Sequence, residues 1–460
     1  MSTLITGGLV VFDTGAQKAD ILIEDGKITG IFAPGCGGSA TKIIDADGLA
    51  VFPGTIDAHF HLGIYNDLAA DFEKDTQGAA IGGLTSFVNF WRGNGSYFDT
   101  LPHFIETGEK KSLVDFSASL GIVTKYHYDE IERYVRELQV TSFKFYCGYQ
   151  DHVSEIFGIP AQDALSLNHG DMYFIFKKIA SISPRLLMCV HAEDAEIFNA
   201  IGDRVKKSGD PQKTLKEFAQ TRPDFAETLA VMSAIYLNSV VGGKMHIVHL
   251  SSGSSVDMIE NLRAVTGSRF TVETCPQYLL LTEDAPCNLD AKVYPPIKTV
   301  QDRERLWDGL KKGILNTVGT DNCPQFLAGK YGKGRDMWSA WAGFPGAGYI
   351  LPALISEGYH KRGMSLERIA QISSSTVART FNLETKGAIR PGVDADLALV
   401  DLDWEREIGP DVYGNTDFSI YNGMKMKGWP RYTLSRGEII QRDGKIVAPS
   451  GRGRFIRRHI

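Results

Sequence analysis

The chain has 460 residues, 43% of them hydrophobic, which is enough for a large core or for one large domain and a smaller one. Its 49 basic and 55 acidic residues give a formal net charge of −6 without a long block of one sign, so we expect no nucleic-acid partner. No apolar run is long enough for a bilayer, no secretory signal is evident, and six scattered cysteines lack CxxC spacing, which favours a cytoplasmic protein with free thiols and no membrane partner.

The order of predicted elements divides the chain into parts. Residues 1–52 contain short strands separated by turn signals such as "EDGK" and "DADG". Residues 53–385 alternate apolar strand-like runs with longer helix-like segments, which predicts a parallel β/α architecture of the size of a (β/α)8 TIM barrel. Strand and turn patterns return over residues 386–440, so we expect both ends to form one small β-domain. Residues 441–460 form a basic C-terminal tail.

Histidine, lysine and aspartate residues lie in or at the end of several strand-like runs. In "TIDAHFH" the side chains alternate between two faces, so Asp57, His59 and His61 share one face. Four further runs carry such residues: Lys144 in "SFKFYCGY", His191 in "LLMCVHAED", His249 in "MHIVHLSS" and Asp321 in "ILNTVGTDN". Because a barrel carries its chemistry at the carboxyl ends of its strands, the set predicts a metal site. The two neighbouring histidines alone would equally fit hydrogen-bonded core residues, and the lysine alone could reach solvent.

With these residues in this order, the chain resembles the cyclic amidohydrolases, the family of hydantoinase, dihydropyrimidinase and allantoinase, with dihydroorotase more distant. The matching segments include "PGTIDAHFH", "SFKFYCGY", "VHAED", "IVHLSS", "ETCPQYLLL", "YPPIK", "GTDNCP", "AGFPGAG" and "RPGVDADLALVD", in the family's order. The resemblance implies a metal-bearing TIM barrel with a small β-sandwich domain formed from both termini. It also implies a homo-oligomer, a tetramer or a dimer, in which residues 441–460 are a candidate contact.

The resemblance assigns a ligand set to two divalent metal ions. His59, His61 and Asp321 would bind the more buried ion, and His191 and His249 would bind the second. Imidazole and oxygen ligands suit Zn2+, and Mn2+ or Co2+ could take its place.

Catalytic and substrate-binding roles follow from the same resemblance. Lys144 would react with CO2 to give N6-carboxylysine, whose carbamate would bridge the ions. A metal-bridging hydroxide would attack the ring carbonyl, and Asp321 would pass its proton to the leaving nitrogen. Tyr149 would donate a hydrogen bond to the developing oxyanion. The other expected substrate contacts are Tyr294 in "YPPIK", Asn322, and Pro345 in "FPG".

Some positions depart from the family pattern. Asn322 stands where relatives often have a histidine, and Tyr294 stands where a small or amide side chain is common. Leu62 follows the histidine pair where dihydroorotase-type enzymes carry arginine, which argues against dihydroorotate as substrate. Arg92 in "NFWRGNG" would either meet a polar or acidic substituent of the substrate or lie in a surface loop.

We therefore expect a binuclear metal-dependent hydrolase that opens a small cyclic amide or imide ring of the hydantoin or dihydropyrimidine kind. The alternatives are an allantoinase or another lactam hydrolase with the same residues, and a non-enzymatic dihydropyrimidinase-like scaffold protein. The scaffold proteins lack a full metal set, whereas all six positions are filled here.

Other polar residues are expected to have no ligand role. Asp57 should accept structural hydrogen bonds, Cys323 should line the site, and His246 should be structural or exposed. The remaining histidines lie in polar segments and are expected at the surface: His103, His127, His152, His169, His360 and His459.

Overall fold

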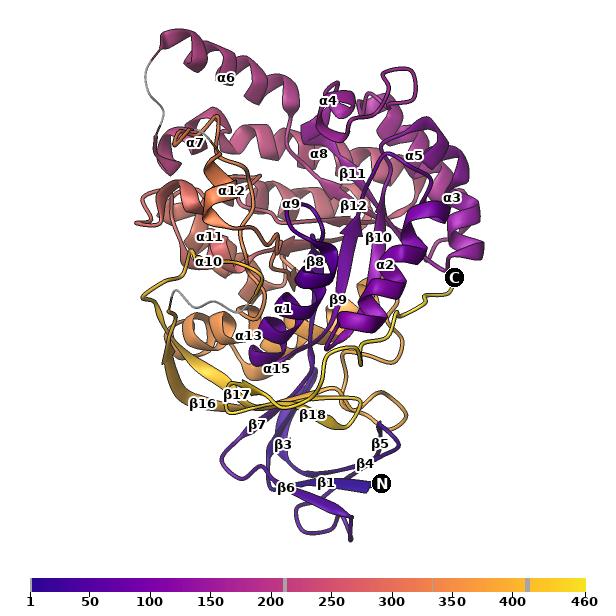
Figure 1. Ribbon diagram of the computed structural model, residues 1–460, viewed down its shortest axis with the longest axis vertical. Helices are drawn as coiled ribbons and strands as arrows, with labels where there is room; N and C mark the ends of the chain where they lie inside the picture. Colours follow the sequence, from indigo (N-terminus) through magenta and orange to yellow (C-terminus); the bar gives the residue numbers. More distant parts are fainter. Residues whose placement is uncertain (1, 210–212, 333, 410–413) are drawn as a thin grey trace.

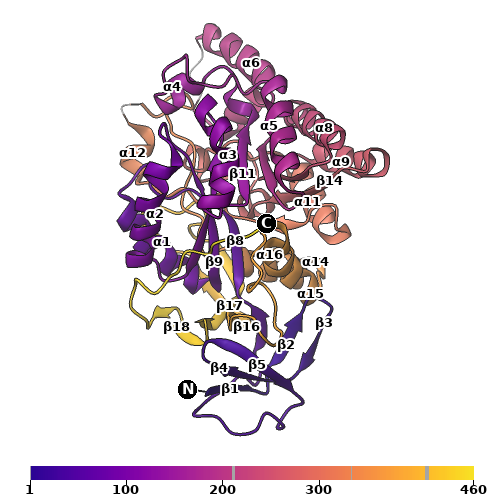
Figure 2. The same cartoon turned by 90° about the vertical axis from the view of Figure 1, so that its right-hand side faces the viewer.

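The structure is a computed structural model that describes residues 2–209, 213–332, 334–409 and 414–460. A helix-covered barrel forms the upper part of the molecule in Figure 1, and a β-domain lies below it. Figure 2 shows that the N-terminus lies in the β-domain, whereas the C-terminus returns to the barrel beside α16 (Thr376–Phe381). The expected fold class, a TIM barrel with a small β-domain from both ends of the chain, is confirmed.

Eight parallel strands form the barrel sheet, in the order in which they occur along the chain. They are β8 (Thr55–Phe60), β9 (Leu84–Trp91), β10 (Asp115–Gly121), β11 (Ser142–Tyr146), β12 (Leu187–His191), β13 (Lys244–Ile247), β14 (Arg269–Thr274) and β15 (Thr317–Val318). A parallel bridge between Phe60 and Asn322 brings the last strand back to the first. All six residues of β8 are buried, as expected of a strand covered on both faces.

Helices and short turns connect successive barrel strands, and the last few short helices follow β15. The longer ones are α1 (Leu68–Ile81), α2 (Tyr97–Lys111), α3 (Lys125–Glu137), α5 (His169–Ile182), α6 (Ala195–Ser208), α8 (Asp224–Val241), α9 (Gly253–Thr266) and α11 (Val300–Lys312). The shorter ones are α4 (Val153–Phe157), α7 (Leu215–Thr221), α10 (Pro276–Leu280), α12 (Leu327–Tyr331), α13 (Ile350–Ala353), α14 (His360–Arg362) and α15 (Leu366–Ala370). Side-chain caps fix several starts; Thr299 and Asp302 form a reciprocal capping box at α11.

The β-domain consists of two sheets that use strands from both ends of the chain. One sheet has the order β5 (Lys27–Phe32), β4 (Asp20–Glu24), β1 (Ser2–Thr6), β6 (Lys42–Asp45). The other has the order β19 (Lys445–Ile446), β18 (Glu438–Arg442), β17 (Lys425–Ser435), β16 (Leu397–Glu407), β7 (Ala50–Pro53), β2 (Leu9–Phe12), β3 (Gly15–Lys18). Antiparallel pairing of β7 with β16 joins the two ends. Paired strands continue to Ile446, six residues beyond the boundary at residue 440 expected from the sequence.

Buried charges connect the β-domain to the barrel. Lys386 Nζ lies 2.6 Å from a carboxylate oxygen of Asp115, at the start of β10, and 2.6 Å from one of Asp396, just before β16. The C-terminal segment packs on the same end of the barrel, because Arg454 and Ile456 exchange backbone hydrogen bonds with Phe116 of β10. In this chain the segment therefore covers its own barrel.

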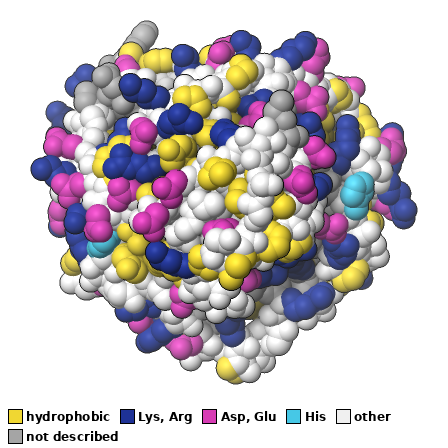
Figure 3. Space-filling view, turned by 90° about the horizontal axis from the view of Figure 1, so that it is seen from below, with side chains coloured by type: hydrophobic (Ala, Val, Ile, Leu, Met, Phe, Trp, Pro, Cys, Tyr) yellow, Lys and Arg dark blue, Asp and Glu magenta, His cyan; other side chains and the backbone are white. Residues whose placement is uncertain are grey.

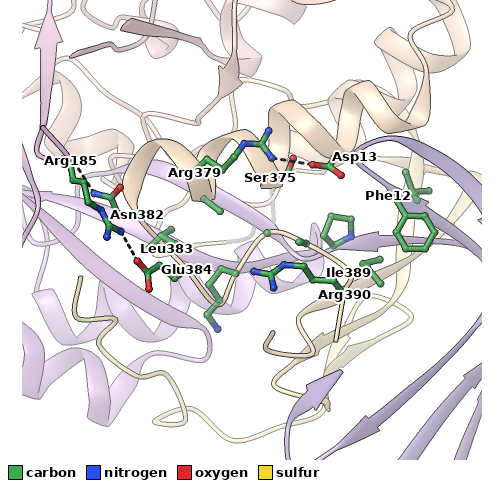
Figure 4. A pocket seen from close by; sticks show the side chains of 16 residues that line it. Phe12, Asp13, Arg185, Ser375, Arg379, Asn382, Leu383, Glu384, Ile389 and Arg390 are labelled. Atoms are coloured by element: carbon green, nitrogen blue, oxygen red, sulfur yellow. Dashed lines mark hydrogen bonds and ion pairs between the residues drawn. The ribbon is translucent and has the colours of Figure 1, made fainter. Parts of the chain in front are cut away.

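A cavity of 510 Å³ lies between the two domains (Figure 4). Its lining includes Pro53, which directly precedes the first barrel strand, so it opens at the amino ends of the strands. Two ion pairs, Arg185 with Glu384 and Arg379 with Asp13, lie along its wall. Because barrel chemistry takes place at the opposite, carboxyl end, this cavity is separate from the candidate site described below.

The surface seen from the β-domain end carries lysine, arginine, aspartate and glutamate side chains in a scattered arrangement (Figure 3). Within the residues that the structure describes, none of the helices combines the length and apolar character needed to cross a membrane.

Candidate metal centre

His59, His61 and Asp321 meet at the carboxyl end of the barrel. Their possible ligand atoms all lie within 4.8 Å of one another, and all three residues are buried. Asp321 Oδ1 lies 3.2 Å from His59 Nε2 and 3.1 Å from His61 Nε2. Burial alone would raise the pKa of Asp321, but the two imidazoles lower it below its usual range. An ionised carboxylate and two imidazoles thus converge on one point.

Glu273, at the end of β14, holds the first histidine in place. Its Oε1 lies 2.7 Å from His59 Nδ1 and accepts the backbone N–H of His249 at 3.2 Å, while Oε2 lies 3.6 Å from His246 Nε2. Burial would raise the pKa of Glu273, but the neighbouring imidazoles hold it well below its usual range. The carboxylate is therefore an acceptor, so His59 carries its proton on Nδ1 and presents a lone pair at Nε2.

This arrangement fits a cation. His59 Nε2 is buried and has no hydrogen-bond partner among the described residues, yet it points at a carboxylate oxygen 3.2 Å away. Burial lowers the pKa of His61 to about 4, so this second imidazole is neutral. Two imidazole nitrogens and a carboxylate are ligands that a divalent metal ion prefers. The residues present at this point therefore fit a metal ion.

A second pair of imidazoles lies beside the first cluster. His191, the last residue of β12, has its Nδ1 only 2.9 Å from Nε2 of His249. The other nitrogen of His191, Nε2, lies 3.1 Å from Glu193, which is in turn ion-paired with Arg222 at 2.7 Å. Burial opposes ionisation of Glu193, but Arg222 and His191 lower its pKa to about 2. His191 and His249 thus direct one nitrogen each to a shared point.

Lys144 of β11 is 1% exposed and lies between these groups. Its Nζ is 4.4 Å from the ring centre of Phe90, and no hydrogen bond or ion pair to it occurs within the described part of the chain. The Phe90 ring centre is also 4.5 Å from that of His59. Burial lowers the pKa of Lys144 to about 8, because the ammonium form is poorly solvated there. Its amine is consequently easier to deprotonate than that of a surface lysine.

Two backbone positions at the centre are strained. Asp321 has a φ of 56° and His249 a φ of 42°, in the left-handed region that non-glycine residues rarely occupy. Such conformations cost on the order of 1–3 kcal/mol and persist where the surrounding structure requires them. Here they lie in the segments that follow β13 and β15 and turn them towards the cluster.

Two further predicted site residues are tyrosines whose rings pack against residues of the second imidazole pair or against Arg222. Tyr149 follows β11 in the short helical turn Cys147–Tyr149, and its ring centre lies 6.0 Å from that of His191. Tyr294 packs against the guanidinium of Arg222, which lies 4.1 Å from its ring centre.

Asn322 uses its side chain within the protein. Its Nδ2 donates to Asp75 at 3.0 Å, and its Oδ1 accepts from the backbone N–H of Gly346 at 2.7 Å and of Ala347 at 3.1 Å. These bonds hold the buried segment that contains Pro345 against the end of the barrel. Asn322 thus positions that segment through hydrogen bonds to its backbone.

Asp57, His246 and His127 were expected to have no ligand role, and the structure shows where each of them lies. Asp57 accepts hydrogen bonds from Thr320 and from the backbone N–H of His59, as expected, and His246 is buried with its Nδ1 2.7 Å from the Thr271 hydroxyl. The expectation for His127 was wrong, because this residue is buried, stacks on Tyr97 and bonds the Gly95 carbonyl at 2.9 Å.

Sequence reasoning missed the two orienting carboxylates. Glu193 lies two residues after His191, so its closeness to a candidate ligand was an available signal, whereas Glu273 is the one carboxylate within the strand-like run "RFTVETCP". Orienting carboxylates are common partners of metal-binding histidines.

A TIM barrel with clustered imidazoles and a carboxylate at its carboxyl end is the architecture of a metal-dependent barrel enzyme. The model of the amidohydrolase family matches residues 50–447, and the chain belongs to this family. It is a hydrolase of the cyclic amidohydrolase group, as its similarity to the following proteins indicates.

Among curated proteins, the D-hydantoinase of Geobacillus stearothermophilus is 31% identical, with 100% of this chain and 97% of the relative covered. An allantoinase of Rubrobacter xylanophilus is 33% identical, with 99% and 97% covered. Among solved structures, the dihydropyrimidinase of Brevibacillus agri superposes with a TM-score of 0.90 at 29% identity, covering 100% of this chain and 99% of that one.

Proposed function

We propose that this protein is a binuclear metal-dependent hydrolase that opens a cyclic amide or imide ring of the hydantoin or dihydropyrimidine type. The observation that carries the proposal is the buried cluster of His59, His61 and Asp321 at the carboxyl end of the barrel. Relatives named hydantoinase and dihydropyrimidinase that match over nearly the whole chain support this substrate class.

The residues assigned to the two ions are those that converge in the centre. His59, His61 and Asp321 would hold one divalent cation, and His191 and His249 the other. We infer Zn2+, with Mn2+ or Co2+ as possible replacements, from the imidazole and oxygen ligands. Two such cations supply an activated water and polarise the carbonyl that is attacked.

Lys144 is assigned as the bridging ligand, in the form of N6-carboxylysine. Only a neutral amine captures CO2, and the burial that lowers the pKa of Lys144 to about 8 makes that form available near neutral pH. The negative carbamate that results would be stabilised by the two cations.

Two side chains carry the proton and charge movements of ring opening. Asp321 is ionised and buried, so it can take a proton from the attacking water and deliver it to the leaving ring nitrogen. Tyr149, beside His191, would donate a hydrogen bond from its phenol to the developing oxyanion. We assign the remaining ring contacts to Tyr294, to the segment around Pro345 and to Asn322, which positions that segment.

An allantoinase activity is the second candidate, because allantoinases match at 33% identity over 99% of the chain. A scaffold role has less support, since all six predicted metal positions are present, five of them buried and His61 with a side chain that is 12% exposed. We also infer a cytoplasmic protein from its six free cysteines, and a homodimer or homotetramer from the family.

The test is a hydrolysis panel with the metal-loaded protein. Dihydrouracil, hydantoin, 5-substituted hydantoins, allantoin, dihydroorotate and simple cyclic imides are each assayed for the ring-opened product. The proposal expects turnover of a hydantoin or a dihydropyrimidine, whereas turnover of allantoin alone would favour the second candidate.

A further inference from the structure

Arg92 extends from the carboxyl end of the second barrel strand towards the candidate metal centre. It directly follows β9 and has the same parity as Phe90, whose ring contacts His59 and approaches Lys144. Trp91, of opposite parity, instead donates to the Thr100 hydroxyl and packs on Phe104 of α2. The backbone alternation therefore puts the arginine on the inner face of the barrel mouth.

The neighbours of Arg92 are aromatic rings. Its Nη1 lies 3.5 Å from the hydroxyl of Tyr149, and its guanidinium lies 5.3 Å from the ring centre of Phe157. A side chain on Gly121 would contact both Arg92 and Tyr146, so the arginine stem is held between β9 and these tyrosines. Arg92 begins the loop between β9 and α2, but its side chain is partly buried and is not fully exposed to solvent.

No aspartate or glutamate among the described residues forms an ion pair with Arg92. The nearby Arg222 differs, because its guanidinium is paired with Glu193 at 2.7 Å. A guanidinium has five N–H donors and stays charged at all physiological pH values. The phenol of Tyr149 occupies at most one of these donors, and the others have no hydrogen-bond partner in the part of the chain that the structure describes, so they remain available to a ligand at the mouth of the site.

We propose that Arg92 binds a carboxylate on a substituent of the cyclic amide, so that the protein prefers acidic ring substrates. The inference rests on the proposed function and narrows its substrate class. Planar guanidinium and carboxylate groups pair through two parallel hydrogen bonds, and a partly buried cation lacking a carboxylate gains most from such a partner.

The position of Arg92 differs from that of the arginine that dihydroorotase-type enzymes carry directly after the histidine pair. Leu62, at the position after the histidine pair, is 1% exposed and packs in the core, while its N–H donates to Asn89. The positively charged group is therefore the Arg92 guanidinium, which follows β9. It lies next to Tyr149, on the side of the site that carries His191 and His249. A substituent that reaches it extends from the ring towards Tyr149 and Phe157.

The test compares two hydantoins that differ in one group, 5-(2-carboxyethyl)hydantoin and its carboxamide, 5-(2-carbamoylethyl)hydantoin. The ratio of their kcat/KM values is measured for the metal-loaded wild type, for Arg92→Met and for Arg136→Met. Arg136 is a suitable control because it is an exposed arginine of α3 that pairs with Glu132. The ratio within each protein cancels any general loss of activity.

We expect the wild type to prefer the carboxylate, and Arg92→Met to lower the carboxylate-to-carboxamide ratio on the order of 10- to 100-fold, as for loss of a hydrogen bond between charged groups. Arg136→Met should keep the wild-type ratio. An equal ratio in wild type and Arg92→Met, with turnover of both hydantoins, would overturn the inference and leave the proposed function standing.

Turnover of neither hydantoin, nor of any other ring in the panel, would instead remove the proposed function. In that case the affinities of the two hydantoins are measured by calorimetric titration into wild type and Arg92→Met as purified, and their ratio is compared. A carboxylate preference that is lost in Arg92→Met would still support the binding role, and equal affinities would overturn it.

Discussion

Replacement of Glu273 by glutamine tests how the first histidine is held. The Glu273 carboxylate lies 2.7 Å from His59 Nδ1, is fully buried, and accepts the N–H of His249 as well. A hydrogen bond to a charged acceptor contributes about 1.5–3 kcal/mol and a neutral one about 1 kcal/mol. The isosteric Glu273→Gln variant keeps the shape and loses the charge, so the hydrogen bond to His59 should be weaker by about 0.5–2 kcal/mol. This corresponds to metal affinity weakened on the order of tenfold.

The assay is a competition between the protein and a chromogenic chelator for Zn2+, with thermal unfolding measured on the same samples. Glu260→Gln on α9 is the control, because that glutamate is exposed and should leave metal affinity unchanged. A folded Glu273→Gln variant with wild-type metal affinity would refute the claim that this carboxylate orients a metal-binding imidazole.

Three further changes have defined outcomes. Lys144→Ala should abolish metal retention and turnover, with partial recovery on addition of propionate; metal retained in full would contradict the bridging role. Burial raises the pKa of Glu227 from 4.5 to about 7, so its contribution to stability is complete below pH 4.5 and is lost as the pH rises through 7. Between these values, the free energy of unfolding from urea titration should fall by up to about 3 kcal/mol more in wild type than in Glu227→Gln; equal falls would contradict this. Lys386→Met leaves the carboxylates of Asp115 and Asp396 buried without their ammonium, and should lower stability by about 3–5 kcal/mol in thermal unfolding; an unchanged midpoint would contradict it.

Local sequence patterns predicted the fold, and they singled out side chains that the structure brings together at the carboxyl end of the barrel, because both depend on strand periodicity. Alternation along "TIDAHFH" puts Asp57, His59 and His61 on one face, and the structure has all three side chains directed towards Thr320 or Asp321. The strand-terminal positions of His191 and Asp321 likewise follow from the βα rhythm, since parallel strands end at the same side of a barrel.

The roles of several residues could not be predicted from the sequence, because they depend on contacts between segments that are distant in the chain. The role of Glu273 requires the register of β14 against its neighbours, and that of Asn322 requires Asp75 on α1 to lie beneath the segment containing Gly346. His127 looks polar in its sequence context, yet stacking on Tyr97 buries it. Whether Arg92 had a carboxylate partner could be decided only once the side chains around it were placed.

The central claim is that the cluster of His59, His61 and Asp321 makes a metal-dependent hydrolase of cyclic amides. Its most direct test measures ring opening of hydantoin and dihydrouracil by the protein as purified, after chelation, and after reloading with Zn2+. The account predicts turnover that chelation removes and Zn2+ restores, and that a His61→Ala variant lacks under all three conditions. Ring opening at an undiminished rate in the chelated protein or in His61→Ala would contradict it.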